Sequence, residues 1–90
     1  MELSVDEIWA LIIRSRFIVA DCTGRNPNVF YEIGIAHTIG KPVIAITQST
    51  TDVPFDLTHR RYIEYEMTPR GMAKFEDSLA RTLSDLMDTT

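Results

Sequence analysis

The hydrophobic and polar positions at the start of the chain predict a helix followed by a strand. Ser4 and Glu7 have the spacing of a capping box ahead of an apolar stretch, which predicts a helix from Val5 to Ser15. The next run, Phe17 to Ala20, is short, wholly apolar and bounded by charged residues. Such a run is typical of a strand that is buried on both faces, as parallel sheets require.

A polar loop then leads into a second helix and a second strand. Residues 21–28, DCTGRNPN, have the composition of a loop, and Asn26 is a suitable N-cap because Pro27 follows it as the first helical residue. The pattern predicts a helix from Pro27 to Ile39 that ends at Gly40, since glycine readily adopts the left-handed conformation that closes many helices. The run KPVIAIT, residues 41–47, predicts another short buried strand.

The second half of the chain predicts one more strand and a long helix. Residues 48–59 have the composition of a loop, and Tyr62 to Tyr65 alternate between polar and apolar, as in a less buried edge strand. Thr68 and Pro69 are expected to cap and open the last helix. Its apolar residues recur at helical spacing and predict a stripe that faces the core: Met72, Phe75, Leu79, Leu83 and Leu86.

This order of helices and strands predicts one small α/β domain over residues 1–90, with a small, mostly parallel sheet flanked by helices. A flavodoxin- or Rossmann-like fold normally opens with a strand, whereas this chain opens with a helix. We therefore expect such a fold without its usual first strand. Three strands leave open edges and exposed apolar surface, so we also expect a homo-oligomer.

Composition and charge narrow the classes of partner. The net charge is −4, with no run of Lys or Arg, which argues against nucleic acid as a partner. The single cysteine, Cys22, cannot form an internal disulfide, and the sequence shows no Cys/His cluster with the spacing of a zinc site. The start, MELSVDEIW, lacks a basic region, and no apolar run is long enough to span a membrane. These features favour a reduced, cytoplasmic protein with no membrane partner and no cofactor.

A carboxylate interrupts the apolar face of the second predicted helix. Residues 29, 32, 33, 36 and 39 share one face of that helix, and only Glu32 among them is charged. Burying an isolated carboxylate is costly, so Glu32 either leans outward to pair with Arg25, Arg16 or Lys41, or has a chemical use. Beside the carboxyl ends of the strands, where open α/β sheets bind ligands, it would be a suitable nucleophile.

The loop before this helix carries candidate ligand-binding groups. Gly24 would let the backbone approach a ligand, and the free N–H groups of the turn from Asn26 through Asn28 to Val29 would form an anion site without a basic side chain, to which Arg25 could add. Asp21 would either hold a ribose hydroxyl or cap the turn that follows it. A carboxylate beside an anion site suits a nucleoside or nucleotide as the small-molecule partner.

The segment FIVADCTGRNPNVFYEIGIAHTIGKPVIAIT, residues 17–47, resembles the signature segment of the nucleoside 2-deoxyribosyltransferase-like superfamily. That signature joins a strand ending in Ala-Asp, a Gly/Asn/Pro loop, Tyr-Glu-x-Gly-x-Ala and Gly-Lys-Pro. The match covers about a third of the chain, and the order of the elements after it also agrees. Because members of the superfamily carry a further N-terminal strand, the resemblance implies that the chain corresponds to the carboxyl-terminal two thirds of such a domain.

The resemblance also implies roles for individual residues. Glu32 would attack the anomeric carbon and form a glycosyl-enzyme, which water or a second base resolves. Asp6, three residues before Trp9, would help to protonate the departing base. Tyr31 would pack beside the sugar or orient the carboxylate, and Gly34 would allow the close approach of a neighbouring element.

Two alternative functions remain open from the sequence. The pattern NVFYEIG, residues 28–34, also resembles bacterial TIR-like domains, in which a glutamate in a similar helix cleaves the nicotinamide glycosidic bond of NAD. Both resemblances imply cleavage of an N-glycosidic bond and differ in the substrate. The other alternative is a non-catalytic module for nucleotide binding or assembly.

Overall fold

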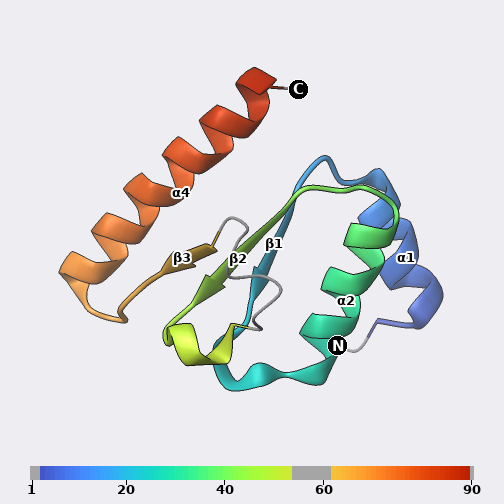
Figure 1. Ribbon diagram of the computed structural model, residues 1–90, viewed down its shortest axis with the longest axis horizontal. Helices are drawn as coiled ribbons and strands as arrows, with labels where there is room; N and C mark the ends of the chain where they lie inside the picture. The colour runs from blue at the N-terminus through green and yellow to red at the C-terminus, as the bar shows by residue number, and fades with distance from the viewer. Residues whose placement is uncertain (1–2, 54–61, 90) are drawn as a thin grey trace.

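The computed structural model describes residues 3–53 and 62–89, which form a three-stranded parallel sheet flanked by helices (Figure 1). This confirms the α/β class and the small parallel sheet that the sequence predicts. The predicted loop over residues 48–59 lies partly outside the described residues. The elements are α1 (Val5–Arg14), β1 (Ile18–Asp21), η1 (Thr23–Arg25), α2 (Pro27–Thr38), β2 (Val43–Thr47), η2 (Thr50–Asp52), β3 (Tyr62–Glu64) and α4 (Pro69–Thr89).

The strands lie in the order β1-β2-β3, and both pairs are parallel. Ile18 is paired with Val43, and Ala45 with Tyr62. Since all three strands run the same way, their carboxyl ends meet at one edge of the sheet, and the short turns η1 and η2 contact each other there. Asp21 belongs to β1, one residue beyond the predicted end of that strand.

Local signals in the sequence set the ends of the helices. The Ser4 hydroxyl accepts a hydrogen bond from the Glu7 amide at 3.2 Å, and the Glu7 carboxylate accepts one from the Ser4 amide, so the predicted capping box forms. Gly40 ends α2 with φ +77°, and the Lys41 amide donates to the Ala36 carbonyl at 2.8 Å. The predicted left-handed stop is therefore confirmed.

Helices lie on two sides of the sheet. α1 and α2 lie together on one side, while α4 lies on the other side beside β3 (Figure 1). One core cluster fills the space between α2 and the sheet: Ala20, Cys22, Ile33, Ala45 and Val53. A second cluster lies where α1 meets α2: Ile12, Ile35 and Ala36. No helix among the described residues has both the length and the apolar character needed to cross a membrane.

The structure corrects two expectations about α2. Ile39, expected on the buried face, is 36% exposed, whereas Ile35 is 5% exposed because α2 packs against α1 as well as against the sheet. Gly34 does not mediate a close approach, since a Cβ built there would meet no atom within 4 Å. The tight glycine is Gly71, where a Cβ would collide with the Glu66 carbonyl oxygen and lie 2.8 Å from the Thr68 hydroxyl.

Candidate functional site

The carboxyl edge of the sheet brings together one polar side chain from the end of each strand. The Tyr65 hydroxyl, directly after β3, donates to the Asp21 carboxylate at 2.6 Å, and the Gln48 amide, directly after β2, lies 3.4 Å from the same hydroxyl. The Thr23 amide donates to the other Asp21 oxygen at 2.9 Å. Of the two uses that the sequence left open for Asp21, the cap of the following turn is therefore formed.

This network determines the charge state of Asp21. Burial raises the pKa of the Asp21 carboxyl, but the hydrogen bonds from Tyr65 and Thr23 outweigh that effect, so the pKa lies below its ordinary value. Asp21 is thus an ionised, oriented carboxylate on a partly exposed edge. Sequence reasoning missed Gln48 and Tyr65 as site residues. Gln48 directly follows one predicted strand and Tyr65 is the last residue of another, so both had to lie at this edge.

The loop after β1 is tied to the loop after β2. Gly24 and Arg25 both have positive φ, 79° and 55°, a conformation that few residues other than glycine adopt. The Gly24 amide donates to the Asp52 carboxylate at 3.0 Å, and the Arg25 guanidinium lies 3.4 Å from the Thr51 carbonyl oxygen. The groups expected to approach a ligand therefore already contact η2.

The start of α2 differs from the anion site that the sequence predicts. The Asn26 side chain accepts a hydrogen bond from the Asn28 amide at 2.9 Å, and its carbonyl accepts one from the Val29 amide at 3.1 Å. These N–H groups were expected to be free, and that expectation is wrong, because the predicted N-cap uses them. Asn26 and Asn28 are exposed, and a ligand anion here would have to displace the cap.

Glu32 lies on the side of α2 that faces α1, and its side chain is half-buried. It lines a cavity of about 140 Å³ between α1, α2 and the start of β1. The other residues that line this cavity are Leu3, Ile8, Leu11, Ile12, Ser15 and Ile18. Within the described residues, no hydrogen bond or ion pair involves the Glu32 carboxylate, so the expected alternative of pairing with Arg25, Arg16 or Lys41 is not formed there.

The remaining predicted site residues do not line this cavity. Asp6 is exposed in the first turn of α1, and Tyr31 is 52% exposed on α2; neither lines the cavity of Glu32. Asp21 follows Ala20, which packs against α2, so its side chain points to the opposite face of the sheet, toward Tyr65. Asp21 therefore lies on the other side of the sheet from Glu32.

Cys22 is fully buried and forms no disulfide. Burial raises the pKa of the Cys22 thiol, and the negative charges of Asp21 and Asp52 raise it further. A thiol held in this state is a poor nucleophile. Among the described residues, no group of three or more His, Cys, Asp and Glu side chains is arranged to hold a metal ion.

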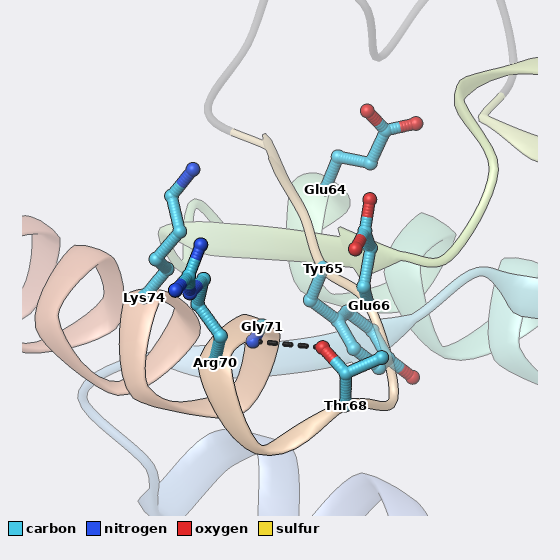
Figure 2. A pocket seen from close by; sticks show the side chains of 7 residues that line it. All are labelled: Glu64, Tyr65, Glu66, Thr68, Arg70, Gly71 and Lys74. Carbon is cyan, nitrogen blue, oxygen red and sulfur yellow. Dashed lines mark hydrogen bonds between the residues drawn. The ribbon is translucent and has the colours of Figure 1, made fainter.

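A second hollow lies where β3 meets α4, with a volume of about 250 Å³ (Figure 2). Two carboxylates, Glu64 and Glu66, stand on one side of it, and two cations, Arg70 and Lys74, stand on the other. Tyr65 forms part of its wall while its hydroxyl bonds to Asp21. The hollow therefore adjoins the carboxyl edge of the sheet, but it offers charges of both signs.

Comparisons with family models, with curated proteins and with solved structures found no match to this chain.

Proposed function

We propose that this chain binds a nucleoside or nucleotide and cleaves its N-glycosidic bond with Glu32 as the nucleophile. The observation that carries the proposal is the Glu32 carboxylate itself, half-buried among aliphatic side chains and unpaired within the described residues. A carboxylate that has lost part of its water and gained no partner is more costly to keep than an apolar residue, which favours a chemical use.

The reaction that suits such a group is a double displacement. A Glu32 oxygen attacks the anomeric carbon, and the bond to the base breaks with its electron pair passing to the base, which takes a proton. Water then attacks the resulting ester, releases the sugar and restores the carboxylate. Asp6 does not line the cavity, so the proposal takes the proton for the base from solvent.

The size and lining of the cavity suit the sugar of the ligand better than the whole nucleoside. A volume of about 140 Å³ is below that of pockets that enclose a whole drug-sized ligand, so the sugar would lie inside and the base outside. The lining is aliphatic except for Ser15 and Glu32, and each buried hydroxyl without a partner is costly. We therefore propose a deoxyribosyl group, which has fewer hydroxyls than ribosyl.

A second candidate, a non-catalytic module for nucleotide binding or assembly, is favoured by a different observation. The amides at the start of α2 and the amide of Gly24 are all engaged within the chain, and so is the Asp21 carboxylate. A site whose polar groups already satisfy one another has fewer groups left to orient a substrate for reaction.

Chromatographic detection of free base separates these candidates. The purified chain is incubated with deoxynucleosides, deoxynucleoside monophosphates, ribonucleosides and NAD, beside the variants Glu32→Gln and Glu66→Gln. The proposal expects base from the deoxy substrates with the parent chain and with Glu66→Gln, and none with Glu32→Gln. Nicotinamide release alone would instead favour the TIR-like alternative.

The remaining outcomes also decide between the candidates. Equal release by the parent chain and by Glu32→Gln would reject Glu32 as the nucleophile. No release from any substrate by a folded chain would reject cleavage, and a rise in melting temperature with one of these ligands would then favour the binding module. A further variant, Asp6→Asn, tests the source of the proton that the departing base takes. If this variant releases no base, Asp6 supplies that proton in place of solvent.

A further inference from the structure

Among the described residues, Glu32 shares the lining of its cavity with one other polar residue, Ser15. Glu32 belongs to α2, whereas Ser15 is the C-cap of α1, so the two come from different walls. Ile8 and Leu11 also line the cavity and precede Ser15 at helical spacing, so all three lie on the same face of α1. Ligand sites combine an apolar lining with a few polar groups that orient the ligand. Ser15 is therefore placed to contact a ligand that reaches Glu32.

The Ser15 hydroxyl has used its hydrogen but not its lone pairs. It donates to the Leu11 carbonyl, one turn back in α1, at 2.7 Å. A hydroxyl has one hydrogen to donate and two lone pairs that accept. Within the part of the chain that the structure describes, no group donates to the Ser15 oxygen. The free capacity of Ser15 is thus that of an acceptor.

This bond to Leu11 makes Ser15 selective for a donor. A ligand hydroxyl that donates to the Ser15 oxygen adds a hydrogen bond and leaves the bond to Leu11 in place. A ligand oxygen that can only accept gains a bond only if the Ser15 hydrogen turns away from Leu11, so that one bond is exchanged for another. Ser15 therefore distinguishes a ligand that offers an O–H from one that offers only acceptor oxygens.

A deoxyribosyl group brings one such donor into the cavity, its 3′-hydroxyl. Burying this hydroxyl among aliphatic side chains without a partner would be costly. In the proposed reaction the Glu32 carboxylate faces the anomeric carbon. The Ser15 oxygen is the remaining polar group among the residues that line the cavity.

We propose that the Ser15 hydroxyl accepts a hydrogen bond from the 3′-hydroxyl of the substrate sugar, and so selects substrates in which this hydroxyl is present and unphosphorylated. The inference rests on the proposed function and names the substrate of that same site more closely. A 3′-phosphate offers acceptor oxygens to an acceptor, and it adds negative charge beside Glu32. Ser15 contacts the sugar and takes no part in the bonds that form and break.

Base release from 2′-deoxynucleosides and from 2′,3′-dideoxynucleosides tests the role of Ser15. Ser15→Ala is expected to lower kcat/KM about three- to tenfold for the deoxynucleosides and to leave it unchanged for the dideoxynucleosides, which lack the 3′-hydroxyl. Ser78→Ala is the matched control, exposed on α4, and should change neither. Loss of the bond to Leu11 alone would slow both substrates equally. An equal fall, or no fall with either substrate, would overturn the proposal.

Titration calorimetry separates a failure of this inference from a failure of the proposed cleavage. Glu32→Gln is titrated with the same nucleosides and with deoxynucleoside 3′-monophosphates, with and without Ser15→Ala, after circular dichroism has shown that each variant is folded. Ser15→Ala is expected to weaken binding of the deoxynucleosides about three- to tenfold and to leave dideoxynucleoside binding unchanged. The 3′-monophosphates are expected to bind more weakly than the deoxynucleosides.

Each outcome of the two experiments is decisive. Base release by the parent chain without the contrast between deoxy and dideoxy substrates would overturn the role of Ser15 alone. The contrast in binding without any base release would overturn the cleavage alone. Binding of the 3′-monophosphates as tight as that of the deoxynucleosides would reject the selection against phosphate, and no binding of any of these ligands would reject both proposals.

Discussion

At the scale of single residues, the hydrogen bond from the Tyr65 hydroxyl to Asp21 links the end of β3 to the end of β1. Tyr65 is 9% exposed and donates to the ionised Asp21 carboxylate at 2.6 Å. Tyr65→Phe keeps the ring and its packing against Phe75 but removes this bond. The free energy of unfolding is expected to fall by about 1 kcal/mol at neutral pH, measured by urea denaturation. An unchanged value would mean that water replaces the hydroxyl without loss.

The same pair gives the stability an expected dependence on pH. Because the pKa of Asp21 is lower in the folded chain than in the unfolded chain, its contribution is present above about pH 4 and is lost as the pH falls through the folded pKa. The difference in unfolding free energy between the parent and Tyr65→Phe should therefore shrink between pH 6 and about pH 3. A constant difference over that range would contradict a role for the Asp21 charge.

At the scale of single elements, two helical glycines have opposite roles. An alanine Cβ at Gly71 would collide with the Glu66 carbonyl and crowd the Thr68 hydroxyl, which caps α4 by accepting from the Gly71 amide (Figure 2). Gly71→Ala is expected to destabilise the fold by about 1–3 kcal/mol. Gly34→Ala meets no atom within 4 Å and is expected to stabilise it by up to about 1 kcal/mol. Urea denaturation measures the free energy of unfolding of both variants. A change of the same sign in the two variants would contradict this prediction.

The ends of the elements could be predicted from the sequence because their causes are local. Ser4 with Glu7, Asn26, Gly40 and Thr68 each act on backbone groups within a few residues, and all of them cap or end a helix as expected. The burial of Ile35 and the tight fit of Gly71 could not be predicted in this way. Both depend on which element lies alongside, and one helix pattern is compatible with several neighbours.

At the scale of the whole molecule, the reactivity of the Cys22 thiol measures how often the core opens. Its side chain has no exposed surface and its pKa is raised, first by burial. In native buffer, the thiol is expected to react with a disulfide reagent at least about a hundredfold more slowly than in the urea-unfolded chain, since reaction requires the core to open. The absorbance of the released reagent, followed over time at a series of urea concentrations, gives the labelling rate of the native chain and that of the unfolded chain. Fast labelling without urea would show that this core opens locally.

The candidate site could be predicted only in part, for a reason that applies to the whole fold. The sequence identified Asp21 and Glu32 as unusual carboxylates, because each follows or interrupts an apolar run. It could not show that Asp21 meets Tyr65, 44 positions later, or that the two carboxylates point to different sides of the sheet. The parallel pairing of the strands determines both the contact of Asp21 with Tyr65 and the side of the sheet on which each carboxylate lies. This pairing joins residues that lie far apart in the chain.

That parallel order has a consequence for the chain while it is being synthesised. Among the described residues, β1 pairs with no strand other than β2, and Val43, the partner of Ile18, is made 25 residues later. At a typical rate of about 5–20 residues per second, the apolar run Ile18 to Ala20 spends roughly one to five seconds without its partner strand. α1 and α2 can form during this interval because their hydrogen bonds are local. Until β2 has left the ribosome, this apolar run therefore lacks the strand that covers its edge and is exposed to aggregation.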